Sequence, residues 1–107
     1  MDWVEFIRSG LLRQAYEISQ HADDERLADG LTVDEVEGAL MRSEILEEYP
    51  QDPRGYSCLA LGFLADGRAV HVVCGGTRQE RLIWITVYLP GLPKWLDART
   101  RNRSRGE

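Results

Sequence analysis

The feature that most restricts the fold is a change in the period of the apolar residues near residue 43. Before this point apolar residues recur every three or four positions, as they do on one face of an α-helix. After it they alternate with other residues, as they do along a strand, in the segments 44–49, 56–64, 69–74 and 81–88. The connections between these segments are too short for a crossover helix, so successive strands are expected to run antiparallel.

The first half of the chain carries the sequence signals of helices. An amphipathic helix is predicted over residues 2–13 from apolar side chains spaced four apart, which are Trp3, Ile7 and Leu11. Residues 15–19 either continue this helix or run as a short extended segment. Ser19 is a candidate N-cap for a second helix over residues 21–28.

Thr32 and Glu35 have the spacing of a capping box, which predicts a helix over about residues 33–42. The whole pattern predicts an α+β fold in two layers, with the N-terminal helices packed on one face of a four-stranded antiparallel meander. At 107 residues the chain is long enough for one domain, which we place at residues 1–98. Residues 99–107 are rich in arginine and poor in apolar side chains, and we expect a flexible tail there.

The charge of the chain is divided between its halves. The formal net charge is −5, but residues 1–53 carry four basic and fourteen acidic side chains, and residues 54–107 carry nine basic and four acidic ones. The halves therefore have net charges of −10 and +5, and we expect an electrically two-sided molecule. The acidic total argues against a protein whose whole surface binds a polyanion, since neutralising phosphates requires an excess of Lys and Arg.

The Asp66-Gly67 pair is typical of a two-residue type I′ hairpin, which would fix the register of the flanking strands. In that register Leu61 lies opposite Val72, on an apolar face that meets the helices. The other face is then a candidate for a shallow groove, and its larger side chains are His71, Trp84 and Tyr88. Alternatively, the C-terminal segment around Trp95 covers this face.

The two cysteines, Cys58 and Cys74, are too few for a disulfide scaffold, and no secretory leader is recognisable. We therefore expect a protein of the reducing cytoplasm. The predicted register places Cys74 on the helix-covered face and Cys58 on the other, so neither a bridge nor a shared metal site is expected. No apolar stretch approaches the roughly 20 residues that span a bilayer, so no membrane segment is expected.

The sequence contains no nucleophile elbow, Walker loop, zinc-protease signature or kinase signature. His21 and Glu25 are four residues apart and would share one face of a helix. Such a pair is a base with an orienting carboxylate, a pair of metal ligands, or an ordinary surface pair. Twelve of the thirteen Lys and Arg residues are arginines, which bind phosphate through two nitrogens at once. Several basic residues lie at strand ends or after the sheet, where they either bind phosphate or are simply solvated: Arg54, Arg68, Arg78, Arg81, Lys94, Arg99, Arg101, Arg103 and Arg105.

A string of segments follows one another along the chain: HADDERLADGLTVDEVEGAL (21–40), ILEEYP (45–50), GRAVHVV (67–73) and ITVYLP (85–90). In this order they resemble a bacterial family known as domain of unknown function 4258. The likeness extends from about residue 16 to residue 101. Proteins of this family resemble in turn the RelE-type toxins, in which two helices pack on an antiparallel sheet whose opposite face cuts mRNA.

The resemblance implies a toxin of a toxin–antitoxin pair, acting as a metal-independent endoribonuclease on mRNA. In that role His71 would be the general acid or base, Tyr88 a stacking or proton-transfer partner, and Arg81 a phosphate ligand. The RNA-binding side chains would be Arg68, Trp84, Lys94, Arg99 and Arg101. The implied partners are an antitoxin protein and RNA or the ribosome, with no cofactor, no metal and no DNA.

The alternative is a noncatalytic domain on the same scaffold, which would hold a protein partner in its aromatic groove or along an exposed strand. The two hypotheses differ in whether His71, Tyr88 and the arginines converge on one open cleft. If the C-terminal segment around Trp95 fills that cleft, catalysis loses its expected site.

Overall fold

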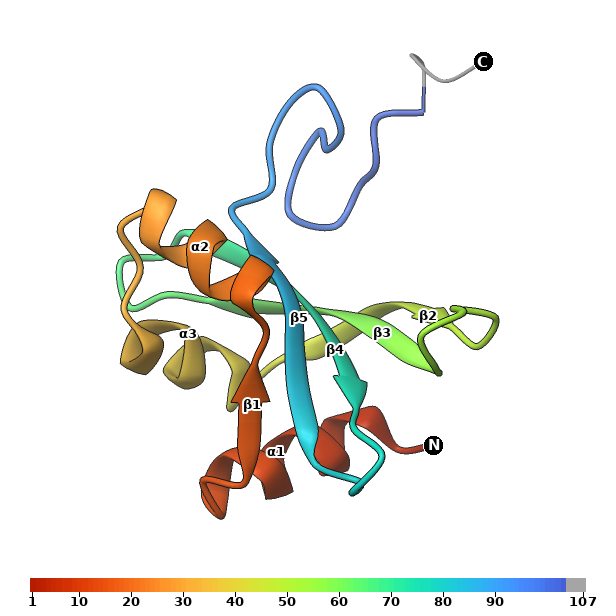
Figure 1. Cartoon of the computed structure of the whole chain (residues 1–107). Helices are drawn as coiled ribbons and strands as arrows, with labels where there is room; N and C mark the ends of the chain where they lie inside the picture. Colours follow the sequence, from red (N-terminus) through yellow and green to blue (C-terminus); the bar gives the residue numbers. More distant parts are fainter. Residues whose placement is uncertain (104–107) are drawn as a thin grey trace.

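The computed structural model describes residues 1–103, which form an α+β fold of three helices and a five-stranded sheet (Figure 1). The helices are α1 (Trp3–Leu12), α2 (Gln20–Ala28) and α3 (Val33–Leu40). The strands are β1 (Tyr16–Ile18), β2 (Glu44–Tyr49), β3 (Ser57–Phe63), β4 (Ala69–Gly76) and β5 (Leu82–Tyr88), in the order β1-β5-β4-β3-β2. None of the helices in this described part of the chain has the length and apolar character needed to cross a membrane.

The helix predictions are confirmed because side chains next to each helix fix its first turn. The Ser19 hydroxyl accepts a hydrogen bond from the Ala22 N–H at 3.0 Å, which caps α2. Thr32 and Glu35 form the predicted capping box, with hydrogen bonds of 3.0 and 2.9 Å in the two directions. These local contacts account for the success of the helix predictions for α2 and α3.

The prediction of a four-stranded antiparallel meander is wrong. Residues 16–18 form a strand that lies parallel to β5, with Tyr16 opposite Leu82 and Ile18 opposite Trp84, so the sheet is mixed. Short connections require antiparallel pairing only between strands that follow each other in the chain. Because β1 and β5 are separated by most of the domain, their parallel pairing does not need a tight connection.

The predicted register of the β3–β4 hairpin is also wrong, by one residue. Ala60 rather than Leu61 lies opposite Val72. The connection runs from Leu64 to Arg68 instead of being a two-residue turn, and the Leu64 N–H donates to the Arg68 carbonyl at 2.8 Å. Because side chains alternate along a strand, this shift exchanges the two faces of β3.

The helix-covered face of β3 is consequently built from small residues. A Cβ added to Gly62 would lie 2.3 Å from the carbonyl oxygen of Ala39, so α3 packs directly on the β3 backbone. Ala60 is buried on the same face. Cys58 lies there too, directly opposite Cys74, so the expectation that the two cysteines occupy opposite faces is wrong.

A bulge in β5 reverses the expected orientation of Trp84. Thr86 lies opposite Val73, whereas Trp84 lies opposite Cys74, so one residue of β5 is extra at this point. Trp84 is therefore fully buried in the core between the sheet and the helices. Its ring stacks on Tyr16, with ring centroids 4.9 Å apart and an interplanar angle of 14°.

The other face of the sheet carries His71 and is covered in part by residues 91–102, which we call the C-terminal strap (Figure 1). Trp95 of the strap is 3% exposed and forms a backbone bridge with Arg101. Leu61, the cross-strand neighbour of His71 on this face, is 1% exposed. The domain thus has a small second core beneath the strap, in addition to the core beneath the helices.

The segment 99–107, expected to be a flexible tail, is described through residue 103, and residues 104–107 lie outside the described residues. Arg99 forms an ion pair with Glu44 at 2.7 Å, and Arg101 forms one with Glu47 at 2.6 Å. Both pairs join the basic half of the chain to the acidic half.

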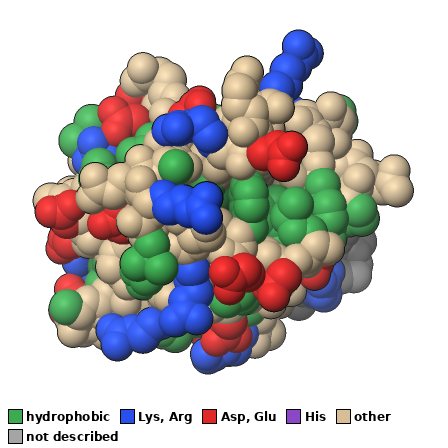
Figure 2. All heavy atoms as spheres, turned by 90° about the horizontal axis from the view of Figure 1, so that it is seen from below, with side chains coloured by type: hydrophobic (Ala, Val, Ile, Leu, Met, Phe, Trp, Pro, Cys, Tyr) green, Lys and Arg blue, Asp and Glu red, His purple; other side chains and the backbone are tan. Residues whose placement is uncertain are grey.

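Charges of both signs are also interleaved at the end of the molecule that carries α1, around a hydrophobic patch (Figure 2).

Candidate functional site

The structure brings two of the predicted catalytic residues together, with His71 buried and Tyr88 half-buried. His71 and Tyr88 lie opposite each other on β4 and β5, and the His71 Nδ1 atom is 3.0 Å from the Tyr88 hydroxyl oxygen. The other ring nitrogen, Nε2, is 2.8 Å from the carbonyl oxygen of Ala98. Burial lowers the pKa of His71 and raises the pKa of Tyr88, so both side chains favour their neutral forms.

Trp95 closes the cleft that was expected above this pair. Its ring contacts His71 edge to face, with centroids 4.5 Å apart and an interplanar angle of 87°. The Arg101 guanidinium lies over the Trp95 ring, 4.6 Å from its centroid, and Glu47 accepts two hydrogen bonds from that guanidinium. The C-terminal segment therefore covers His71, as the alternative in the sequence analysis expected.

The predicted phosphate-binding and RNA-binding residues in the sheet lie in three separate places. Arg81 pairs with Glu17 at 3.5 Å at the start of β5. Arg68 pairs with Asp66 at 2.8 Å in the β3–β4 connection. Trp84 is buried beneath the helices, on the face opposite His71. These side chains do not converge on one cleft.

The predicted RNA-binding residues of the C-terminal strap are mostly engaged within the protein. Arg99 holds both carboxylate oxygens of Glu44, at 3.0 and 2.7 Å, and Arg101 holds both of Glu47, at 2.6 and 2.8 Å. Each arginine lowers the pKa of the carboxyl group that it binds. Lys94 is exposed in the strap. The paired arginines fasten the strap to β2.

An open groove of about 400 Å³ lies elsewhere, over the end of β4 and the start of β5. Gly75 in its floor is four residues along β4 from His71, so both residues belong to the same face of the sheet. We call it the His21 groove; it is lined by Ser19, His21, Arg54, Gly55, Tyr56, Gly75, Gly76, Thr77, Ile83 and Ile85. The sequence predicts a groove on a sheet face but does not identify these residues as its walls.

One wall of the His21 groove is set by the short length of β1. That strand ends at Ile18, and side chains then take over the pairing with β5. The Ser19 hydroxyl donates to the Ile85 carbonyl at 2.9 Å, and the Glu25 Oε1 atom accepts from the Val87 N–H at 2.8 Å. These two bonds fix the first turns of α2 against the edge of β5.

His21 lies in the first turn of α2, where Glu25 orients its ring. The His21 Nε2 atom is 3.3 Å from the Glu25 Oε2 atom, while the other oxygen of that carboxylate is anchored on β5. The His21 side chain is 67% exposed and that of Glu25 is 26% exposed. Glu25 thus orients the His21 imidazole, which is accessible from the groove.

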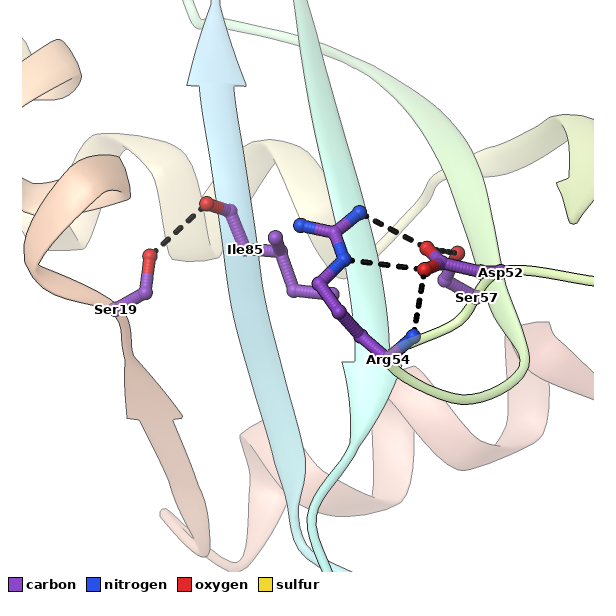
Figure 3. A network of polar contacts seen from close by, with 5 residues as sticks. All are labelled: Ser19, Asp52, Arg54, Ser57 and Ile85. Atoms are coloured by element: carbon purple, nitrogen blue, oxygen red, sulfur yellow. Dashed lines mark hydrogen bonds and ion pairs between the residues drawn. The ribbon is translucent and has the colours of Figure 1, made fainter.

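The opposite wall carries Arg54, which Asp52 holds in place (Figure 3). The Asp52 carboxylate accepts from the Arg54 backbone N–H at 2.9 Å and from two guanidinium nitrogens at 3.1 and 2.9 Å. Ser57 at the start of β3 donates to the same carboxylate at 2.8 Å. The guanidinium extends over β4 toward Ile85, and it holds the pKa of the Asp52 carboxyl well below its usual range.

The floor of the groove consists of glycine and isoleucine residues. A Cβ on Gly75 would lie 2.9 Å from the Cδ1 atom of Ile85, so a larger residue there would displace that side chain. Gly76 continues the floor at the end of β4, and Ile83 completes it on β5. A flat apolar floor between a histidine and an arginine suits a ligand that is planar at one end and anionic at the other.

The sequence held only part of the signal for this site. The spacing of His21 and Glu25 was visible, but their place beside β5 depends on β1, which the sequence left ambiguous. Arg54 follows an aspartate by two positions, as Arg68 and Arg99 also do, so this spacing alone does not single it out.

The chemistry available in the groove is proton transfer at His21 and anion binding at Arg54. Among residues 1–103, no cluster of three or more His, Cys, Asp or Glu side chains is arranged to hold a metal ion.

A family profile described as Domain of unknown function (DUF4258) matches residues 18–89. The chain belongs to this family. The DUF4258 match includes both walls and the floor of the His21 groove, whereas the C-terminal strap lies beyond it. No curated protein and no solved structure matches the chain.

Proposed function

We propose that this DUF4258 protein is a metal-independent endoribonuclease, the toxin of a bacterial toxin–antitoxin pair, and that it cuts mRNA in the cytoplasm from the His21 groove. The observation that carries the proposal is an exposed imidazole held by an anchored carboxylate, facing a fixed guanidinium across one groove. The resemblance to RelE-type toxins motivates the choice of RNA and of an antitoxin as partners.

In the proposed reaction the RNA 2′-hydroxyl attacks the adjacent phosphorus and gives its proton to His21. The bond from phosphorus to the 5′-oxygen breaks, the leaving oxygen takes a proton from water, and His21 gives the proton it accepted back to solvent, so the products are a 2′,3′-cyclic phosphate and a 5′-hydroxyl. Glu25 keeps the His21 ring oriented throughout these transfers. DNA is not a substrate because it lacks the 2′-hydroxyl.

Arg54 is assigned to the phosphate. Negative charge accumulates on the non-bridging oxygens as the 2′-oxygen attacks, and a fixed guanidinium stabilises that charge without reorganising. Asp52 fixes the guanidinium by accepting its hydrogen bonds, and Ser57 donates a hydrogen bond to the Asp52 carboxylate. Since Asp52 uses the Nε and one terminal nitrogen of Arg54, the guanidinium offers its other terminal nitrogen to an anion.

The expression test uses tightly induced protein in a bacterial host, with growth and total RNA followed together. Wild-type protein is expected to arrest growth and fragment mRNA, and His21→Ala and Arg54→Ala to relieve both effects at unchanged protein level. Arg68→Ala is the control, because Asp66 likewise accepts from the Arg68 backbone N–H at 3.0 Å and from its Nε at 2.8 Å, and Arg68 does not line the groove.

Normal growth and intact RNA in cells that contain soluble, folded wild-type protein would contradict the proposal. That outcome would favour the noncatalytic protein-binding domain, and the next step would be to recover its partner. If the His21→Ala and Arg54→Ala variants still arrest growth, the assignment of the active site to the His21 groove would be contradicted, but the proposed ribonuclease activity would not.

A further inference from the structure

Cys58 and Cys74 lie directly opposite each other on β3 and β4. Directly opposed residues of an antiparallel pair have Cα atoms roughly 4.5 or 5.5 Å apart, and disulfides span Cα separations of roughly 4.4–6.8 Å. Their side chains also project from the same face of the sheet. The strand register therefore brings these two cysteines within the range that a disulfide bridges.

The environment of the two thiols is that of an isolated pair. Both are free thiols, both are completely buried, and both belong to the core beneath the helices. A hydrogen bond with the Cys58 thiol, together with burial, raises the pKa of the Cys74 thiol well above its usual value. The two side chains therefore lie opposite each other within one apolar core.

We propose that Cys58 and Cys74 are a dithiol site that a small disulfide oxidises to an intramolecular cross-strand disulfide. One protein thiolate attacks a sulfur of the small disulfide and releases one small thiolate, and the second protein thiolate then attacks the protein sulfur of the mixed disulfide and releases the other small thiolate. One S–S bond forms in the protein and one breaks in the oxidant. Both protein sulfurs are oxidised, and the oxidant leaves as two thiols.

The bridge would form one residue away from the His21 groove. The next pair in the register is Ser57 and Gly75; the first holds Asp52, and the second forms the groove floor. Oxidation would close a loop from Cys58 to Cys74 around the β3–β4 connection. We therefore expect the oxidised protein to resist unfolding more strongly, with the walls of the groove tied together.

Burial makes the exchange slow, so the test is an equilibrium measurement. The purified protein is equilibrated in buffers of reduced and oxidised glutathione, remaining thiols are alkylated, and intact mass gives the fraction that has lost two hydrogen atoms. The same measurement in concentrated urea gives the reference for the unfolded chain. Cys58→Ser and Cys74→Ser are the controls, because each can form only a mixed disulfide with glutathione or a disulfide between two chains.

The equilibrium constant for the intramolecular disulfide is expected to be greater in the native protein than in urea, by about tenfold or more for a loop of this size. Equal constants, a smaller constant in the native protein, or a mixed glutathione disulfide as the main native product would overturn the proposal. This readout does not involve RNA, so its failure leaves the proposed ribonuclease activity untouched, and the reverse also holds.

Discussion

The His71 Nδ1 atom lies 3.0 Å from the Tyr88 hydroxyl oxygen, and its Nε2 atom lies 2.8 Å from the Ala98 carbonyl oxygen. A carbonyl oxygen only accepts, so in the neutral ring Nε2 carries the hydrogen and Nδ1 accepts from Tyr88. The two residues that the sequence resemblance made catalytic thus connect the sheet to the C-terminal strap. In this contact His71 is completely buried and Tyr88 is half-buried.

Lowering the pH is expected to destabilise the protein through His71. Burial lowers its pKa in the folded state below the ordinary value of 6.5, so the unfolded chain binds the proton more tightly. Its contribution to stability is present above pH 6.5 and is lost as the pH falls toward the folded-state pKa. Urea unfolding between about pH 7.5 and about pH 5.5 should show a falling free energy of unfolding that His71→Gln flattens. Equal pH dependence in both proteins would contradict this assignment.

Removing the Trp95 side chain is expected to reduce the free energy of unfolding by about 3 kcal/mol, since it is buried against His71 and beneath Arg101. Leu96→Ala is the neighbouring control; Leu96 is 58% exposed, and the expected loss is below about 0.5 kcal/mol. Urea unfolding measures both. Similar losses for the two variants would mean that the strap does not pack on the sheet as described.

Two glycine substitutions should have opposite effects. Gly62→Ala would place a Cβ 2.3 Å from the Ala39 carbonyl oxygen, so α3 must move away from β3, and we expect a loss of about 3 kcal/mol. Gly38 lies in α3, and a Cβ there would meet no heavy atom within 4 Å outside its chain neighbours and the backbone of its own helix, so helix propensity should raise stability by about 0.5–1 kcal/mol in Gly38→Ala. Thermal or urea unfolding of both variants tests this; tolerance of Gly62→Ala would contradict the packing.

The sequence predicted those parts of the fold that depend on neighbouring residues. Ser19, Thr32 and Glu35 act within one turn of the helices that they cap, so their roles were visible without any tertiary information. Strand β1 has three residues and is recognisable only through its pairing with β5, far along the chain. The parallel pair therefore could not be predicted from local pattern.

The prediction of which sheet face each side chain occupies failed for a related reason. A connection from Leu64 to Arg68 in place of a two-residue turn shifts the β3–β4 register by one, and the β5 bulge turns Trp84 toward the helices. His21 follows β1 at one edge of the sheet, and Arg54 lies in the β2–β3 connection near the other edge; both line the groove over β4 and β5. A site of this kind depends on register and topology together, and spacing in the sequence reports neither.

The central claim is that the His21 groove cleaves RNA without a metal ion. Its most direct test is cleavage of a synthetic single-stranded RNA by the purified protein in the presence of a chelator, with product ends identified by mass. Wild-type protein is predicted to leave a 2′,3′-cyclic phosphate and a 5′-hydroxyl. The cleavage rate is predicted to fall by at least about 100-fold in His21→Ala and in Arg54→Ala, and to be unchanged in Arg68→Ala. Absence of cleavage by folded wild-type protein, or cleavage at an undiminished rate by His21→Ala, would contradict it.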